Sequence, residues 1–439
     1  MDRADQFATL EALSSLPRGR VAALAGRNFS GRTHLLRRWT GLGAPSEGSR
    51  LPAGPRRPLS AYVGPEVYNA LSGLATTVRQ ELMLAGPDAF QPDRLFPLVE
   101  RLRLLPLSER NPFTLSGGEQ TCLAVVSALA MRPAGLALDC PTEQVDSDLK
   151  LILTRWLNRG GGPTSTVIAD NRLGEYAGEF REIFRVECEG SEGNGERKFT
   201  IGGIAEGDYA FELRGPAFGF DFDAIAFRYG RGPMVLRDVS ARLEPSLYFL
   251  DGENGAGKST LAKILSGVLK PRRGRVIVNE REYRPWRQPG QMVAYHFQNP
   301  DLQLFSTSVD EEVVAGPRAL GVEARESVRR AEAILRAFGL CGVRREHPLD
   351  LPFVLRKRLA MAATLAMGCP WTILDEPTLG QDDVASEALA RIIESILAAG
   401  AGVILITHSR WFRERLRGKT LRLRDGVISV GESEGGALP

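Results

Sequence analysis

Short apolar runs alternate along the chain with longer stretches whose apolar residues recur at helical spacing. The runs have the length of buried strands, and most of them end at a glycine or an aspartate. They lie at residues 21–26, 136–139 and 166–170 in the first half and at residues 247–252, 372–375 and 403–408 in the second half. This alternation predicts an α/β fold with a mainly parallel sheet, whose strands bind ligands at their carboxyl ends.

The two halves of the chain share one order of segments. TTVRQELMLAGP (76–87) matches TSVDEEVVAGP (307–317), and SALAMRPAGLALDCPT (127–142) matches ATLAMGCPWTILDEPT (363–378). Small differences in spacing are what loop insertions cause. Because a repeat of this kind indicates a duplicated structural unit, we predict two domains of one fold.

Composition sets the predicted domain boundaries. EGSEGNGERK (189–198) is rich in glycine and charge and poor in apolar residues, which is typical of a linker. We therefore predict a first domain at residues 1–188, a linker at 189–220 and a second domain at 221–439. Each domain is expected to carry a helical subdomain beside its sheet, and RESVRRAEAILRAFGL (325–340) is one such helical segment.

GENGAGKST (252–260) matches the phosphate-binding loop pattern, in which glycines allow backbone N–H groups to approach a phosphate closely. Lys258 is expected to reach the β- and γ-phosphates, and Ser259 to bind Mg²⁺. A chance glycine turn is the alternative, but the motifs that follow in order argue against it. The candidate nucleotide-binding residues of this loop are Gly252, Asn254, Gly255, Gly257, Lys258, Ser259 and Thr260.

Further candidates for ATP chemistry follow predicted strands. Asp375 ends an apolar strand and is expected to hold Mg²⁺, while Glu376 is the candidate general base for the attacking water. Gln298 is expected to contact Mg²⁺ and the γ-phosphate and to position that water. His408 is a candidate γ-phosphate contact, with an ordinary surface histidine as the alternative. Tyr229 could stack on adenine, although an aromatic residue at a strand end can also be core.

The first half contains LSGGEQ (115–120), which can bind a phosphate in a different way. Ser116 offers a hydroxyl group, Gly117 and Gly118 offer unobstructed N–H groups, and a helix N-terminus follows. With these motifs the chain resembles a tandem ATP-binding-cassette (ABC) ATPase over nearly its whole length. The resemblance implies that two cassettes pair within the chain, and that ATP with Mg²⁺ lies between the phosphate loop of one and the signature peptide, LSGGEQ, of the other.

A finer resemblance concerns the segment FQNPDLQLF (297–305) followed by residues 307–317. It is most similar to the ATPases of energy-coupling-factor transporters, including the cobalt and nickel branch. This resemblance implies ATP hydrolysis coupled to transport, integral membrane subunits in separate chains as partners, and a peripheral place on the cytoplasmic face of the cell membrane. The apolar residues Leu302, Leu304 and Phe305 could form part of a groove for a membrane partner, or could be ordinary core.

The first half has lost its own catalytic residues. Its loop reads GRNFSGRT (26–33), with Phe29 in place of Gly255 and Arg32 in place of Lys258. Cys140 stands where Glu376 provides the base, and Asp170 is expected in place of His408. Pro65 aligns with Gln298, although insertions there leave Glu66 as an alternative. Because no general base remains, we expect no catalysis there, although Thr33 and Asp139 leave weak binding of Mg²⁺ and nucleotide conceivable.

The second half has lost its signature peptide, which reads LPFVLR (351–356). Pro352 has no N–H to donate, and Phe353 and Val354 fill the space that glycines leave for a phosphate. The two losses are complementary, since each half keeps what the other lacks. We therefore predict one hydrolytic composite site and one dead site.

Composition excludes several other classes. The net charge is +3, from 56 basic and 53 acidic residues, so no strongly basic field favours nucleic acid as a partner. The 5 cysteines are scattered and form no C-x-x-C, which argues against a structural metal site and fits a reducing cytosol. No apolar stretch approaches the roughly 20 residues that span a bilayer.

Two other functions stay open on the sequence alone. The first is a soluble ABC protein of the translation-factor type, although the linker here is short and acidic where that type has a long charged helix. The second is a regulatory protein that binds ATP without useful turnover, against which the presence of Glu376 and His408 argues.

Overall fold

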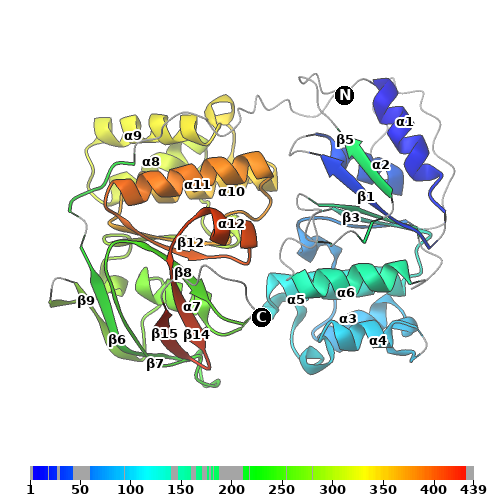
Figure 1. Cartoon of the computed structure of the whole chain (residues 1–439), viewed down its shortest axis with the longest axis horizontal. Coiled ribbons are helices and arrows are strands. Elements are labelled where there is room, and N and C mark those ends of the chain that lie inside the picture. Colours follow the sequence, from blue (N-terminus) through cyan, green and yellow to red (C-terminus); the bar gives the residue numbers. More distant parts are fainter. Residues whose placement is uncertain are drawn as a thin grey trace. The chain divides into compact units, whose positions relative to one another are not determined.

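The computed structural model describes residues 3–17, 19–26, 30–42, 60–92, 94–139, 147–159, 165–170, 176, 179–180, 182–186, 211–216, 218–253, 255–278 and 280–431. The chain divides into two compact units (Figure 1). The first is built mainly from Met1–Lys198, and the second from Phe199–Thr378 and Val384–Pro439.

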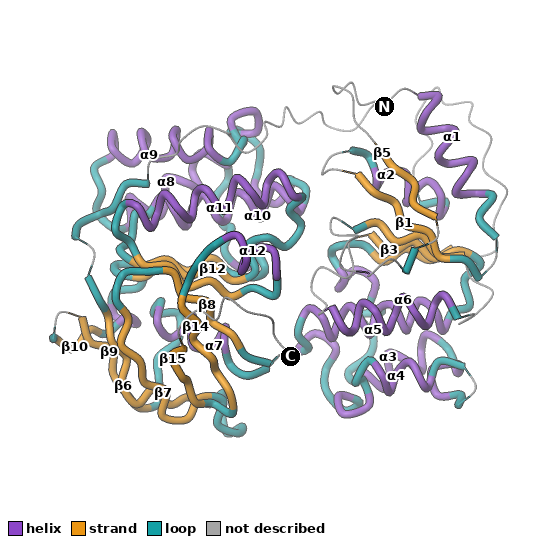
Figure 2. The backbone as a smooth tube through the Cα atoms, in the orientation of Figure 1, coloured by secondary structure: helices purple, strands orange, loops and turns teal. Residues whose placement is uncertain are grey.

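The first unit is a parallel sheet between two layers of helices (Figure 2). Its strand order is β2-β3-β4-β1-β5, and every pair in it is parallel. The strands are β1 (Val21–Gly26), β2 (Ser60–Val63), β3 (Gly135–Asp139), β4 (Ser165–Ala169) and β5 (Glu182–Val186). The helices are α1 (Arg3–Ser14), α2 (Arg32–Thr40), α3 (Val78–Ala85), α4 (Phe96–Arg101), α5 (Gly117–Ala130) and α6 (Ser147–Asn158).

Both faces of this sheet are buried, which explains why its strands read as continuous apolar runs. On β3, Leu136 and Leu138 join a core with the helical subdomain formed by α3 to α5, whereas Ala137 faces a second core. That second core contains Leu13 of α1 and Leu36 of α2. Alternate residues of one strand therefore pack into separate cores, as the period of two in a strand requires.

The second unit contains the same kind of sheet and adds an antiparallel sheet. Its main sheet has the order β11-β12-β13-β8-β14-β15, parallel except for the last pair, and the antiparallel sheet has the order β10-β9-β6-β7. The main strands are β8 (Leu247–Asp251), β11 (Val293–His296), β12 (Trp371–Asp375), β13 (Gly402–Ile406), β14 (Lys419–Arg424) and β15 (Val427–Gly431). The antiparallel strands are β6 (Phe220–Phe227), β7 (Leu236–Leu243), β9 (Arg273–Val278) and β10 (Arg281–Tyr283).

Helices of the second unit pack on both faces of its main sheet. They are α7 (Lys258–Leu265), α8 (Val309–Ala319), α9 (Ala324–Ala337), α10 (Phe353–Ala366), α11 (Asp383–Ala398) and α12 (Arg410–Arg415). Leu374 of β12 faces a core with α8 to α11, and Ile373 faces a core with α7 and the antiparallel sheet. Helix α7, which starts directly after the phosphate loop, is thus held between two sheets.

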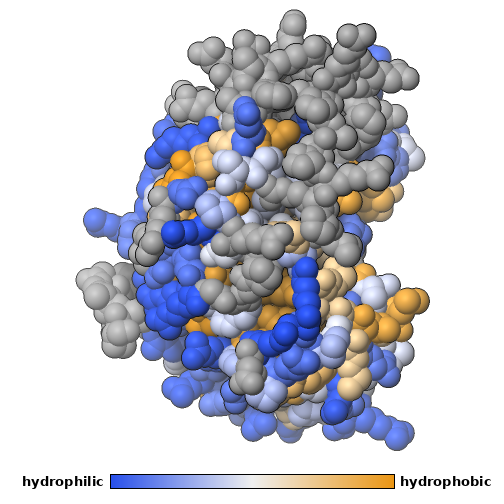
Figure 3. Space-filling model, turned by 90° about the vertical axis from the view of Figure 1, so that its right-hand side faces the viewer, coloured by the Kyte–Doolittle hydropathy of each residue, from blue (hydrophilic) through white to orange (hydrophobic). Residues whose placement is uncertain are grey.

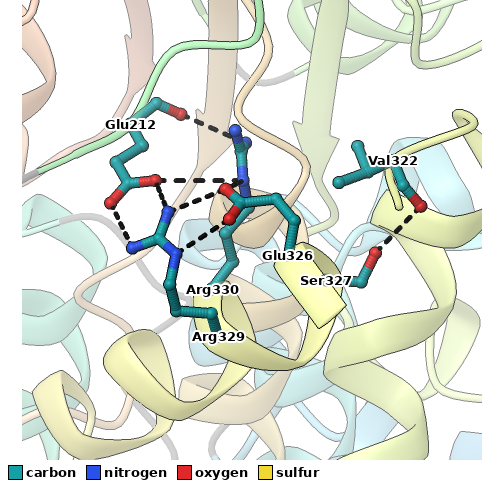
Figure 4. A network of polar contacts seen from close by, with 6 residues as sticks. All are labelled: Glu212, Val322, Glu326, Ser327, Arg329 and Arg330. Atoms are coloured by element: carbon teal, nitrogen blue, oxygen red, sulfur yellow. Dashed lines mark hydrogen bonds and ion pairs between the residues drawn. The ribbon is translucent and has the colours of Figure 1, made fainter. Parts of the chain in front are cut away.

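The described residues at the end of the predicted linker pack on the second unit. Phe211 is buried in its core and its N–H donates to the Ser395 hydroxyl at 2.9 Å. Glu212 forms ion pairs with Arg329 and Arg330 of α9, and Glu326 bridges the same two arginines (Figure 4). The arginines hold the pKa of Glu326 down to about 2. All four side chains are at least partly exposed, so the network orients the segment more than it stabilises the fold.

Candidate functional site

The phosphate loop of the second unit connects β8 to α7. Gly252 has φ 153°, and a Cβ there would lie 2.3 Å from the carbonyl oxygen of Leu423, so only glycine fits. Gly257 has φ 101° and is the N-cap of α7, where no side chain caps the helix. The first N–H groups of α7 therefore have no side-chain acceptor and are oriented for an anion. Asn254 lies outside the described residues.

Lys258 is held by the backbone of its own loop. Its Nζ donates to the carbonyl oxygens of Gly252 at 2.6 Å and Glu253 at 3.2 Å. Burial lowers the pKa of Lys258, and the nearby carboxylates of Glu376 and Asp251 oppose that shift. The ammonium group thus lies directly over the loop, where the phosphate of a bound nucleotide would meet it.

A cluster of oxygen atoms lies beside the loop. The hydroxyl groups of Ser259 and Tyr295 donate to Oδ2 of Asp375 at 2.8 and 2.9 Å. Burial raises the pKa of Asp375, while the hydrogen bonds from Ser259 and Tyr295 oppose the rise. A serine hydroxyl and a carboxylate are hard oxygen ligands of the kind Mg²⁺ prefers, so these residues fit that ion. Gln298 lies two residues after the end of β11, the strand that pairs with β12.

Glu376 has an unusual backbone. Its φ is +47°, which is uncommon for a residue other than glycine, and such conformations concentrate at functional sites. Its N–H donates to the Ile406 carbonyl at 2.8 Å. Its carboxylate accepts from the His408 N–H at 3.0 Å and from the Thr407 hydroxyl at 3.3 Å. The residues that follow β13 therefore hold the carboxylate of the candidate general base in place. They also bring Nε2 of His408 to 3.9 Å from Oε1 of Glu376.

Tyr229 lies near the start of α7. Its hydroxyl is 3.2 Å from the Thr260 hydroxyl, and its ring packs edge-on against Phe227 with centroids 5.0 Å apart. Half of the side chain is exposed, so a face of the ring is open to stacking. This position is compatible with an adenine contact.

Three contacts in this site were not predicted from the sequence. Tyr295 and Thr407 bind the two acidic candidates, and Arg413 forms an ion pair with Asp251 at 3.2 Å, one residue before the loop. A signal existed for Tyr295, since the repeat places Tyr62 at the same strand position in the first half. No motif or repeat pointed to Arg413.

The signature peptide of the first unit has well-formed helix-cap geometry. Ser116 is the N-cap of α5 and forms a capping box with Glu119, whose carboxylate accepts from the Ser116 N–H at 2.8 Å. Gly117 is the first helical residue. The corresponding helix of the second unit, α10, starts after Pro352 and has no side-chain cap. The two helix N-termini thus differ in the residues that would meet an anion.

The first unit keeps part of the oxygen cluster at the position of the lost site. The Tyr62 hydroxyl donates to Oδ2 of Asp139 at 2.9 Å, and hydrogen bonds from Thr33 and Tyr62 oppose the rise of the Asp139 pKa that burial causes. Arg32, in the position of Lys258, donates to the Asp170 carbonyl at 3.0 Å. Phe29 and Cys140 lie outside the described residues.

The sheet register corrects one correspondence between the halves. Asp139 is paired with Ala169 and Asp375 with Ile406, so Asp170 aligns with Thr407. The expectation that Asp170 takes the place of His408 was therefore wrong by one residue. It failed because apolar strands carry no marker of register, which only the hydrogen-bonded pairing fixes.

The fold and the loop define a nucleotide-binding α/β ATPase with two copies of one core. The family model of ABC transporters matches residues 12–143 and 236–379, which together exceed half of the chain. The chain therefore belongs to the ABC transporter family, and its relatives indicate ATPase activity.

Similar proteins include transporter subunits. A putative ABC transporter ATP-binding protein of Caldanaerobacter subterraneus is 28% identical over 76% of this chain and 69% of its own length. An energy-coupling factor transporter ATP-binding protein of Thermotoga maritima is 35% identical over 42% of this chain and 71% of its own length. A solved structure titled as a model of ribosome-bound archaeal Pelota and ABCE1 shares the fold, with TM-score 0.68, 18% identity, and coverage of 93% of this chain and 74% of that one. No helix in the part of the chain that the structure describes is long and apolar enough to cross a membrane.

Proposed function

We propose that this chain is the ATP-hydrolysing subunit of a membrane transporter of the energy-coupling-factor type, with one hydrolytic composite site. The observation that carries the proposal is the opposite distribution of parts between the units. Lys258 and Glu376 belong to the second unit, and the capped signature helix that starts at Ser116 belongs to the first. Each unit supplies a part that the other does not contain.

In the proposed site, ATP binds at the phosphate loop of the second unit. Lys258 and the first N–H groups of α7 bind its phosphates, and Ser259 and Asp375 would hold Mg²⁺, which supplies charge neutralisation at the phosphates. Glu376 takes a proton from the attacking water, while Gln298 and His408 orient that water and the γ-phosphate. Ser116, Gly117 and Gly118 complete the site from the first unit. Tyr229 stacks on the adenine.

The proposed membrane partner would bind near the Gln298 segment. Leu302 and Phe305 are 69% and 79% exposed, which is unusual for large apolar side chains and typical of a binding surface. At the position of Phe305 the first unit has Leu74, which is 81% exposed. On the face drawn in Figure 3, apolar and hydrophilic side chains are interspersed, as on the surface of most folded proteins. Since a Thermotoga relative is named as an energy-coupling factor transporter subunit, we propose an integral membrane subunit as the partner.

The test compares equivalent changes in the two units. Glu376→Gln removes the proposed base and should lower kcat of Mg²⁺-dependent ATP hydrolysis by roughly 100-fold or more. Arg32→Ala changes the loop of the proposed dead site and should leave kcat within about twofold of wild type. Thermal unfolding of both variants checks that they are folded. A comparable loss in both variants would refute a single hydrolytic site.

A second experiment tests the transport assignment. The tagged chain is purified from detergent-solubilised membranes, and the co-purifying proteins are identified by mass spectrometry. An integral membrane protein bound in stoichiometric amount is the expected result. Ribosomes as the main bound species would instead support a translation-factor role.

A further inference from the structure

Helix α10 of the second unit carries three consecutive basic residues that are buried. Arg356, Lys357 and Arg358 are 8%, 0% and 4% exposed. Basic side chains are almost never buried to this degree unless they are paired, so a specific role is required. Arg356 is the last residue of the degenerate signature peptide, and Lys357 and Arg358 follow it. Their contacts with the rest of the second unit therefore have to explain their burial.

Lys357 binds the backbone of the Gln298 segment. Its Nζ donates to the carbonyl oxygen of Gln298 at 2.6 Å, across a sequence separation of 59 residues. A buried amine and a peptide carbonyl form a strong hydrogen bond because the surroundings exclude competing water. The residue that the proposed function assigns to water positioning is therefore fixed at its main chain by α10.

Two further contacts connect α10 to the same segment. Gln303 donates to the Ala360 carbonyl at 2.9 Å and to the Thr364 hydroxyl at 2.8 Å, and its own oxygen accepts from the Phe297 N–H at 3.2 Å. Gln303 thereby links the residue before Gln298 to the middle of α10. The connection between the helix and the segment is made at several points.

An ion pair forms a third connection between α10 and the Gln298 segment. Nε of Arg356 lies 2.8 Å from Oδ1 of Asp301, in the short helix η8 (Pro300–Leu302). Arg356 is nearly buried, which reduces solvent screening of this pair. Residues 297–303 are thus bound along one face of α10, and Lys357 is the point nearest to the proposed chemistry.

The first unit uses the equivalent helix positions differently. Thr121 occupies the place of Lys357, and its hydroxyl donates to the Gly117 carbonyl one turn earlier in the same helix. Gln120 occupies the place of Arg356 and donates to the Pro112 carbonyl. The buried amine that reaches the loop thus occurs in the unit with the catalytic residues, whose signature peptide is degenerate.

We propose that Lys357 is a positioning residue for ATP hydrolysis, which holds the main chain of Gln298 and transmits displacements of α10 to it. This inference rests on the proposed function, because it assumes that Gln298 positions the attacking water. Holding the main chain limits the places that the Gln298 side chain can reach, and misplacement of a positioning group by about 1 Å can cost roughly 100-fold in rate.

The test is a double-mutant cycle on the full-length chain. Lys357→Met keeps the length and apolar stem of the side chain and removes the donor. We expect kcat to fall by about 10- to 100-fold while the Kd for ATP in the absence of hydrolysis changes by less than about threefold. In the Gln298→Ala background the same substitution should cause no further loss, because both changes act through one group. Lys357→Arg, which keeps a donor, should restore part of kcat.

A matched control makes the same chemical change elsewhere. Lys150 of the first unit is 3% exposed, and Lys150→Met also replaces a buried amine by a thioether. We expect it to alter thermal stability but not kcat. If Lys357→Met fails to fold, Lys357→Gln, with a shorter donor, serves in its place and should give an intermediate kcat.

The outcomes separate the two proposals. If Gln298→Ala leaves kcat unchanged, the role of Gln298 in the proposed function fails, and this inference fails with it. If Gln298→Ala lowers kcat but Lys357→Met does not, this inference alone is wrong. Full additivity of the two losses would also overturn it, since Lys357 would then act independently of Gln298.

Discussion

At the scale of single residues, the two halves share one arrangement around a buried carboxylate. Asp375 and Asp139 each end a strand, and each accepts a hydrogen bond from a tyrosine on the neighbouring strand. The donor is Tyr295 in the second unit and Tyr62 in the first. Because a buried carboxylate without donors is costly, the tyrosines explain how each aspartate remains oriented.

This pairing offers a matched test in two sites of one molecule. Tyr295→Phe removes one donor to Asp375. It should lower kcat and raise the Mg²⁺ concentration that gives half-maximal ATP hydrolysis, by about 5- to 30-fold for a bond of roughly 1 to 2 kcal/mol. Tyr62→Phe makes the same change at Asp139, where no catalysis is expected, and should leave kcat unchanged. Steady-state kinetics over a range of Mg²⁺ concentrations measure both. An equal effect of the two substitutions would contradict the assignment of catalysis to the second unit.

At the scale of elements, a buried carboxylate paired with two half-exposed arginines joins two parts of the first helical subdomain. Asp88, in the short helix η2 (Pro87–Phe90), accepts two hydrogen bonds of 2.6 Å from Arg132 and one of 2.9 Å from Arg94. Arg132 lies just beyond the end of α5. Arg132, followed by Arg94, holds the pKa of Asp88 below its usual range. The pair therefore fixes the C-terminal end of the signature helix.

We expect Asp88→Asn to lower the free energy of unfolding by about 1 to 3 kcal/mol at pH 7, because hydrogen bonds to a charged group are lost. The lowered pKa means that this stabilisation is present above the ordinary carboxyl pKa and disappears as pH falls through the lower folded-state value. The difference between wild type and variant should thus be constant from pH 8 to about pH 5 and should shrink below about pH 4. Urea unfolding followed by circular dichroism measures it.

The control for this prediction is a pair in the same unit whose arginine is similarly exposed but whose carboxylate is less buried. Glu179→Gln breaks the contact with Arg155, whose side chain is half exposed, and should cost less than about 0.5 kcal/mol. If Asp88→Asn is no less stable than this control, the contacts of the buried Asp88 carboxylate do not hold the subdomain together.

Elements were predictable from sequence to different degrees. The apolar runs at 136–139 and 372–375 became β3 and β12 because strands buried on both faces have an uninterrupted apolar sequence. The helix expected at 325–340 is α9, Ala324–Ala337. The antiparallel sheet between Phe220 and Tyr283 was not predicted, because register shifts interrupt the regular alternation of buried and exposed residues that marks a strand.

The candidate site was predictable only as far as sequence motifs extend. Lys258, Ser259 and Asp375 carry recognisable patterns, and the structure brings them together at one strand edge. Lys357 could not be found in this way, because its partner is 59 residues away in sequence and the contact depends on how α10 packs. Only the repeat marked Tyr295, and its contact with Asp375 depends on the pairing of β11 with β12. Local sequence motifs identify residues that can bind a nucleotide or take part in catalysis. Contacts between residues distant in sequence depend on the tertiary structure.

At the scale of the whole molecule, the proposed function assigns all the catalytic residues to one of two units that share a fold. The first unit retains Tyr62, Asp139 and the capped helix at Ser116, so its remaining parts are ordered although its base is absent from the sequence. Retention of such parts fits a unit that supports the hydrolytic site of its neighbour. We therefore expect stoichiometry to distinguish this chain from a protein with two working sites.

Trapping of nucleotide by vanadate measures that stoichiometry. Vanadate mimics the γ-phosphate during hydrolysis, so each competent site retains one ADP, and we expect one ADP per chain and none for Glu376→Gln. Cys140→Glu restores a carboxylate to the first unit, yet trapping and kcat should stay at the wild-type level. The reason is that Phe353 and Val354 occupy the positions of the signature glycines, and Arg32 still replaces the loop lysine. Two trapped ADP per chain, or a doubled kcat, in Cys140→Glu would mean that the missing base is the only reason why the proposed dead site does not hydrolyse ATP.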